Sequence, residues 1–95
     1  MSQRPQTGGR VSMDLVSVAP EAIVYRAGLF QPDAEWHGEA RIDGAGVVTL
    51  ERVTGAPDWL VEYARAFLRG EWRARQGPDA APWPDRITRW RSAAS

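Results

Sequence analysis

The chain has 95 residues, of which 43% are hydrophobic and 25% are charged, as in ordinary globular domains. This length allows a single hydrophobic core, and the composition argues against a chain that is disordered throughout. The 12 basic and 12 acidic residues cancel, and cysteine is absent. The sequence therefore offers no net field that would attract nucleic acid, no disulfide framework, and no apolar run near the ~20 residues of a membrane helix.

All 12 basic residues are arginine, and lysine is absent. Together with abundant alanine, glycine and proline, this indicates the codon usage of a GC-rich bacterial genome more than a selection of guanidinium groups for recognition. Residues 1–10 are polar and Gly-rich, and they lack the apolar core of a signal peptide. We therefore expect a cytoplasmic bacterial protein in which residues 1–10 form a flexible tail.

Residues 11–53 show the two-residue periodicity of β-strands, interrupted by turn residues. Val11–Leu15 alternates apolar and polar side chains, and residues 22–30 are almost continuously apolar, as in a central strand. In residues 36–42 the apolar side chains again alternate with charged ones, and a Gly-rich loop separates them from residues 47–53. The short connections favour an antiparallel meander of four strands.

From residue 57 the apolar period becomes that of a helix. Apolar side chains recur at spacings of three and four, with Phe67 expected in the middle of the apolar face, and Gly77 and Pro78 follow as a stop signal. The face consists of Leu60, Tyr63, Ala64, Phe67, Leu68 and Trp72. This pattern predicts one long amphipathic helix over residues 57–75, packed on the sheet. The fold class is therefore α+β, with a single domain over residues 11–95.

Residues 79–92 are rich in tryptophan and arginine, and their prolines hold the backbone away from the helical region. We expect a short segment there, either helical or extended. Part of the helix would otherwise stay uncovered, because Trp59 and Trp72 widen its apolar arc beyond what one sheet face can cover. Either this segment or a second subunit must cover the remainder.

His37 is the single histidine, and it is flanked by Glu35 and Glu39. All three side chains would share one face of a strand, where such groups can ligate a metal or move protons. Strand alternation alone already accounts for them, and the chain supplies no further nitrogen or sulfur ligand. We therefore interpret them as the solvated face of a strand and expect no metal site.

Catalytic motifs are also missing. Ser12, Ser17 and Thr49 do not lie in a recognisable nucleophile turn, and the glycine clusters match neither a phosphate-binding loop nor a dinucleotide fingerprint. We expect no catalytic residue and no cofactor, so the protein is interpreted as a non-enzyme.

The leading functional hypothesis is a non-catalytic module that acts through protein–protein contact, as a homodimer or with another protein, and not at a membrane. Tryptophan and arginine concentrate at the centres of interfaces. The interface candidates are therefore Trp59, Trp72, Trp83, Arg86 and Trp90.

The alternative hypothesis is a nucleic-acid-binding module. Arginines at four-residue spacing on the helix, together with arginines interleaved with tryptophan near the C-terminus, can contact phosphates and stack on bases. The residues concerned are Arg65, Arg69, Arg73, Arg89 and Arg91.

Overall fold

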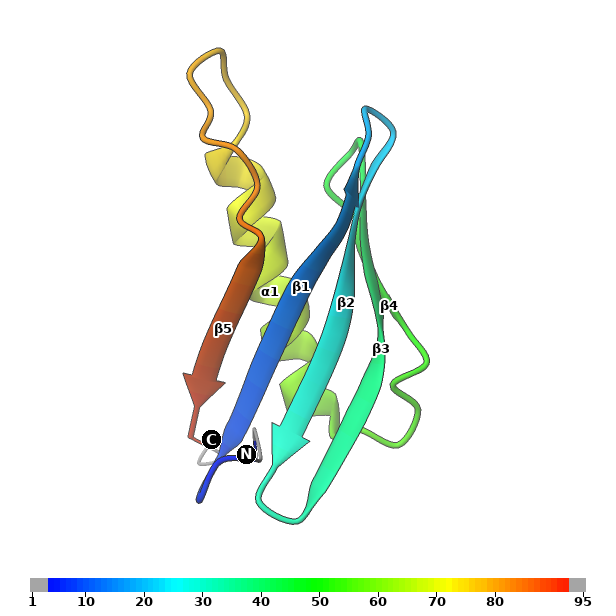
Figure 1. Cartoon of the computed structure of the whole chain (residues 1–95), viewed down its shortest axis with the longest axis vertical. Coiled ribbons are helices and arrows are strands. Elements are labelled where there is room, and N and C mark those ends of the chain that lie inside the picture. The colour runs from blue at the N-terminus through cyan, green and yellow to red at the C-terminus, as the bar shows by residue number, and fades with distance from the viewer. Residues whose placement is uncertain (1–3, 93–95) are drawn as a thin grey trace.

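A computed structural model describes residues 4–92 of the chain. It shows one antiparallel sheet with a single helix against one face (Figure 1). The elements are, in chain order, β1 (Gly9–Val18), β2 (Ala22–Gln31), β3 (Ala34–Asp43), β4 (Val48–Glu51), α1 (Asp58–Ala74) and β5 (Arg86–Arg91). The predicted α+β class is confirmed, with the meander β1–β4 first and one helix after it.

The sheet has five strands, in the order β4-β3-β2-β1-β5. The Trp/Arg-rich segment takes its extended form and becomes the edge strand β5, which pairs antiparallel with β1. Ile87 lies opposite Met13 and is 3% exposed, whereas the other residues of β5 are exposed. Ile87 and the backbone ladder to β1 thus join this strand to the sheet.

The N-terminal expectation is wrong for the residues that the structure describes. β1 begins at Gly9, inside the range 1–10 that was expected to be a flexible tail. A Cβ atom on Gly9 would lie 2.6 Å from the side chain of Leu60 and 2.7 Å from that of Trp59. This glycine therefore lets the first turn of α1 approach the sheet closely, which the sequence pattern did not reveal.

Residues before β1 also contact the body of the protein. Pro5 is buried, and the Nε atom of Arg4 lies 3.0 Å from a carboxylate oxygen of Glu35. The indole N–H of Trp90 donates a hydrogen bond of 2.8 Å to the carbonyl oxygen of Thr7. These contacts attach residues 4–8 to the sheet, while residues 1–3 of the expected tail lie outside the described part.

The hydrophobic core lies between α1 and one face of the sheet. Leu60, Ala64 and Leu68 have no exposed surface and form the centre of the helical face. Tyr63 and Phe67 are partly buried on the flank nearest β5. The helix is confirmed within one residue at each end, but the centre of its buried face is Ala64 and Leu68 and not Phe67.

The opposite face of the sheet carries no helix and is mostly polar. Its register places charged side chains of opposite sign across from each other, for example Asp14 opposite Arg26 and Arg26 opposite Glu39. Such cross-strand pairs stabilise a solvated sheet face. We call this side the open face.

β1 changes phase near its end. The register with β2 shifts between Leu15 and Ser17, so Val16 occupies a bulge and Val18 lies opposite Ile23. A bulge re-aims the side chains that follow it. Val16 and Val18 are each 56% exposed.

Candidate functional site

The five interface candidates do not form one surface. Trp72 and Trp83 line the same cleft, at the end of the sheet that holds the β1–β2 and β3–β4 turns. Trp59 lies against Gly9 and Trp90 binds Thr7, so both are near the start of β1 at the opposite end. Arg86 projects on the open face, where its Nε atom lies 2.9 Å from Asp14.

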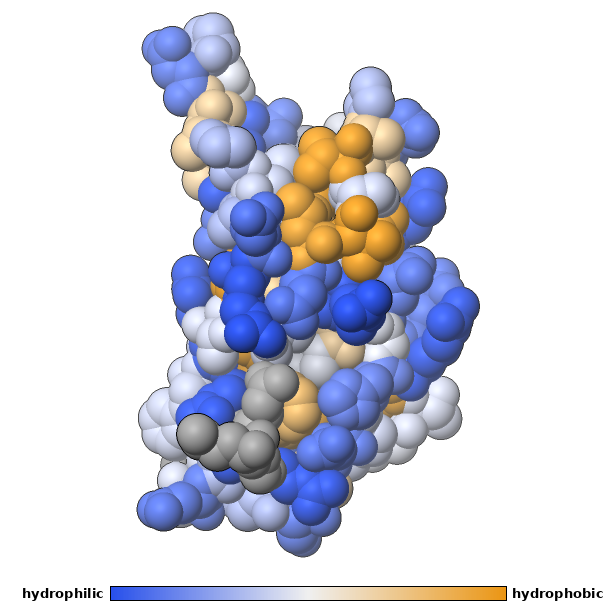
Figure 2. Space-filling model, viewed as in Figure 1, coloured by the Kyte–Doolittle hydropathy of each residue, from blue (hydrophilic) through white to orange (hydrophobic). Residues whose placement is uncertain are grey.

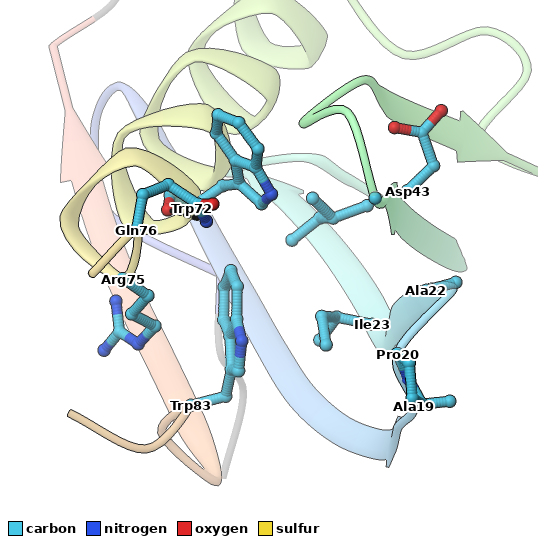
Figure 3. Close-up of a pocket in the computed structure, with 11 residues that line it drawn as sticks. Ala19, Pro20, Ala22, Ile23, Asp43, Trp72, Arg75, Gln76 and Trp83 are labelled. Atoms are coloured by element: carbon cyan, nitrogen blue, oxygen red, sulfur yellow. Dashed lines mark hydrogen bonds between the residues drawn. The ribbon is translucent and has the colours of Figure 1, made fainter. Parts of the chain in front are cut away.

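The cleft has a volume of about 200 Å³ and is open to solvent. Trp72 comes from the last turn of α1, and Trp83 comes from the segment that leads into β5. Figure 3 shows both indoles directed into the cleft, with Ile23 and Pro20 on the side across from Trp83. The full lining is Ala19, Pro20, Ala22, Ile23, Ile42, Asp43, Gly44, Trp72, Arg75, Gln76 and Trp83.

Trp83 is held in place by contacts on two sides. The Arg75 guanidinium lies over its ring, 4.9 Å from the centroid, and Tyr25 meets it edge-on with ring centroids 6.3 Å apart. The Tyr25 hydroxyl donates a hydrogen bond of 2.7 Å to the carbonyl oxygen of Pro84, which fixes the backbone next to Trp83. Burial raises the pKa of Tyr25 to about 12, against a smaller lowering effect of Arg75.

The Trp72 indole packs against Gly46 in the β3–β4 turn. Gly46 has a φ of +86°, and a Cβ atom there would lie 2.6–2.9 Å from three atoms of the Trp72 ring. The indole therefore packs directly on the backbone of the β3–β4 turn, as the Gly-rich loop permits. Trp72 and Trp83 are thus fixed walls of the cleft, each supported by the chain around it.

The charged groups of the cleft are already engaged. Arg75 pairs with Glu71, and the two side chains are 13% and 22% exposed. Asp43 accepts hydrogen bonds of 2.8 and 3.0 Å from the backbone N–H groups of Ala45 and Val47. With both charges satisfied inside the protein, the cleft suits an uncharged group better than a phosphate or a carboxylate.

Exposed valines lie at the same end of the molecule. Val16, Val18 and Val47 are each 56% exposed, and they flank the β1–β2 and β3–β4 turns. Figure 2 shows a hydrophobic patch near this end of the open face, bordered by hydrophilic surface. We call the cleft and these three valines together the apolar end.

Sequence reasoning missed the valines of the apolar end. It placed a strand over Val11–Leu15 and gave no role to the residues after it. The parity of the apolar residues changes from odd, at positions 11, 13 and 15, to even, at Val16 and Val18. Such a change is the sequence signal of a bulge, and it could have revealed that the apolar side chains after it are re-aimed.

The candidate nucleic-acid residues are divided between two surfaces. Arg69 and Arg73 are exposed on the outer side of α1, and Arg65 pairs with Glu62 at 3.1 Å. Arg89 and Arg91 instead lie over aromatic rings on the flank of α1. The five arginines therefore do not form one continuous basic surface.

The arginines of β5 cover the flank of α1. The Arg89 guanidinium lies 6.0 Å from the centroid of Phe67, and that of Arg91 lies 5.6 Å from the centroid of Tyr63. Arg89 also approaches Glu71 at 3.6 Å. The C-terminal segment is thus what covers the Tyr63 and Phe67 side of the wide apolar arc.

A small pocket on the open face is lined in part by the single histidine. Ser12, Gly28 and His37 stand opposite one another on three adjacent strands and line a pocket of about 50 Å³, and the Phe30 ring packs on Gly28. The Ser12 hydroxyl is buried and has no hydrogen-bond partner within residues 4–92. The pocket can hold one water molecule for it, but a serine 3% exposed is not an accessible nucleophile.

His37 is exposed, and its Nε2 atom lies 3.1 Å from Glu35. Hydrogen bonds from His37 and Arg4 lower the pKa of the Glu35 carboxyl. The described part of the chain contains no group of three His, Cys, Asp or Glu side chains that could hold a metal ion. The strand alternation predicted this solvated position for His37 correctly.

Comparisons of the chain with protein-family models, with curated proteins and with solved structures find no match. Within residues 4–92, no helix has both the length and the apolar character needed to cross a bilayer. What the protein does must therefore be inferred from its surfaces.

Proposed function

We propose that the protein is a non-catalytic module that acts through protein–protein contact, and that it self-associates through the apolar end. The observation that carries this proposal is the combination of three half-exposed valines with an open cleft whose charges are already paired. Covering such a surface with another apolar surface is favourable, because water is released from both. The tryptophans of the cleft supply the rigid aromatic groups on which tight contacts depend.

The free edge of the sheet at β5 is a less favourable place for self-association. A second copy that paired with β5 antiparallel over its full length would place Arg86 opposite Arg91, once on each side of the twofold axis. Like charges directly opposite each other destabilise a strand pair, and charged edge strands are a common protection against such pairing. The same arginines are engaged with Asp14 and with the ring of Tyr63. The apolar end carries no comparable obstacle.

Sedimentation equilibrium of the full chain tests the proposal. We expect a defined oligomer at high micromolar concentration, and we expect the double variant Val18→Glu/Val47→Glu to be a folded monomer. Both valines are exposed, so the substitutions should leave the circular dichroism spectrum unchanged. Ala66→Glu, on the exposed side of α1, is the matched control and should associate like the unmodified chain. A full chain that stays monomeric, or a double variant that associates normally, would overturn the proposal.

A further inference from the structure

The segment between α1 and β5 projects from the body of the protein. Residues 76–82 are all exposed, and they present Pro78, Pro82 and two alanines to solvent with Asp79 as their single charge. Figure 1 shows this segment and the β1–β2 turn as two separate projections at the same end of the molecule. The cleft is lined by residues that border both projections. A projecting segment with a single charge and an open cleft with two tryptophan walls therefore lie at the same end of the molecule.

The segment cannot fill the cleft of its own chain. Trp83 follows the segment directly, and its ring is already held against Tyr25 and Arg75 as a wall of that cleft. The carbonyl oxygen of Pro82 also accepts a hydrogen bond of 3.3 Å from Arg75. These contacts hold the C-terminal end of the segment at Arg75 and Trp83, and the cleft beside them stays open.

The chemistry of the cleft suits a segment of this kind. Grooves lined by aromatic side chains bind proline-containing segments well, because the rigid rings stack on each other and the segment loses little entropy. A nearly uncharged segment also fits a cleft whose charged groups are paired internally.

We infer that the cleft receives residues Pro78–Pro82 of a second copy of this chain, and that its own segment enters the cleft of that copy. This inference rests on the self-association proposed above and names its contact. A twofold axis through the apolar end makes the exchange reciprocal, because each copy presents one projection and one cleft. The cleft is then completed by the partner copy, and the exposed valines border the contact.

Cross-linking tests the exchange, because the chain contains no cysteine that would give a background. One variant carries Ala80→Cys on the segment, and a second, labelled with ¹⁵N, carries Ala19→Cys in the cleft. Mixed under mild oxidation, they should form the mixed disulfide at least about tenfold faster than Ala80→Cys does with Ala66→Cys on the outer side of α1. The mass of the labelled chain identifies the mixed product. Equal rates for the two mixtures would overturn the inference.

Sedimentation equilibrium of Pro78→Ser/Pro82→Ser separates this inference from the proposed function. Both prolines are exposed, so the double variant should fold normally but dissociate with a Kd raised by about tenfold or more. If it associates as tightly as the unmodified chain, the segment does not occupy the cleft, while the self-association itself stands. If the unmodified chain is monomeric, the proposed function fails first, and cross-linking should stay at the control rate in both mixtures.

Discussion

The alkaline stability of this protein should depend on one tyrosine. Tyr25 has no exposed surface, and burial raises its pKa from 10.0 to about 12. The folded state therefore keeps the phenol proton at a pH at which the unfolded chain has lost it. Its contribution to stability is complete below pH 10 and is lost as the pH rises from about 10 to about 12. A difference of this size corresponds to about 2–3 kcal/mol over the whole interval.

The composition of the chain makes this effect measurable. Lysine and cysteine are absent, and the chain has two tyrosines, Tyr25 and Tyr63. Tyr25→Phe removes the hydrogen bond to the carbonyl oxygen of Pro84 and should cost about 1 kcal/mol at pH 8. It should also remove the steep alkaline loss. The free energies of unfolding of the two proteins should therefore become similar near about pH 11, and the variant should be the more stable of the two above that pH.

Urea denaturation at fixed protein concentration, repeated from pH 8 to pH 12, measures both effects. Tyr63→Phe is the control, because it removes the other phenol and leaves the bond between Tyr25 and Pro84 intact. This control should lose stability between pH 10 and pH 12 as the unmodified chain does. If Tyr25→Phe and the unmodified chain decline in parallel, the buried phenol does not control alkaline stability and the reasoning fails.

Three further predictions concern stability and are measured by urea denaturation at neutral pH. Gly38→Ala should destabilise by about 1–3 kcal/mol or more, because its Cβ atom would lie 1.9 Å from a backbone oxygen of the facing β4 segment. Gly70→Ala, which meets nothing within 4 Å on the outer side of α1, should instead stabilise by about 0.5–1 kcal/mol, and the opposite order would contradict both. Leu68→Ala should cost about 2–5 kcal/mol and the half-buried Phe67→Ala only about 1–2 kcal/mol, so a larger effect at Phe67 would place the centre of the helix face elsewhere. Removal of residues 1–8 should cost about 1–2 kcal/mol, because Pro5 is buried and the carbonyl oxygen of Thr7 accepts a hydrogen bond from Trp90. An unchanged denaturation midpoint would instead support a tail that does not contribute to stability.

Local periodicity predicted the meander and the helix because both bury a regular face. Residues that alternate along β2 and β3, or recur every three or four along α1, leave a pattern that a short window of sequence contains. β5 leaves no such pattern, because Ile87 is its one buried residue and the others are arginine, threonine and tryptophan in exposed positions. Its assignment as a strand depends on pairing with β1, more than 70 residues earlier along the chain. That information is absent from any local window.

The phase of the helix was predictable only in part. A broad apolar arc fixes which residues avoid water, but not which of them face the sheet directly. At Gly9 the missing side chain lets Leu60 and Trp59 approach β1 closely. Leu60 and Leu68 then become central, and Phe67 moves to the flank under Arg89. A contact between residues 9 and 60 is not visible in the apolar pattern of either segment.

The location of the apolar end follows from the lengths of the elements. The 17-residue helix spans about 25 Å, whereas strands of 10 residues span about 33 Å. α1 starts beside Gly9 at one end of the sheet and ends near the β3–β4 turn, where Trp72 packs on Gly46, so the β1–β2 turn is left without a helix over it. Trp72 and Trp83 reach across part of the uncovered region, and the space that they leave is the cleft. The surplus aromatic surface that the sequence suggested for the sides of the helix is covered there by β5 and its arginines, and what is left for a partner lies beyond the end of the helix.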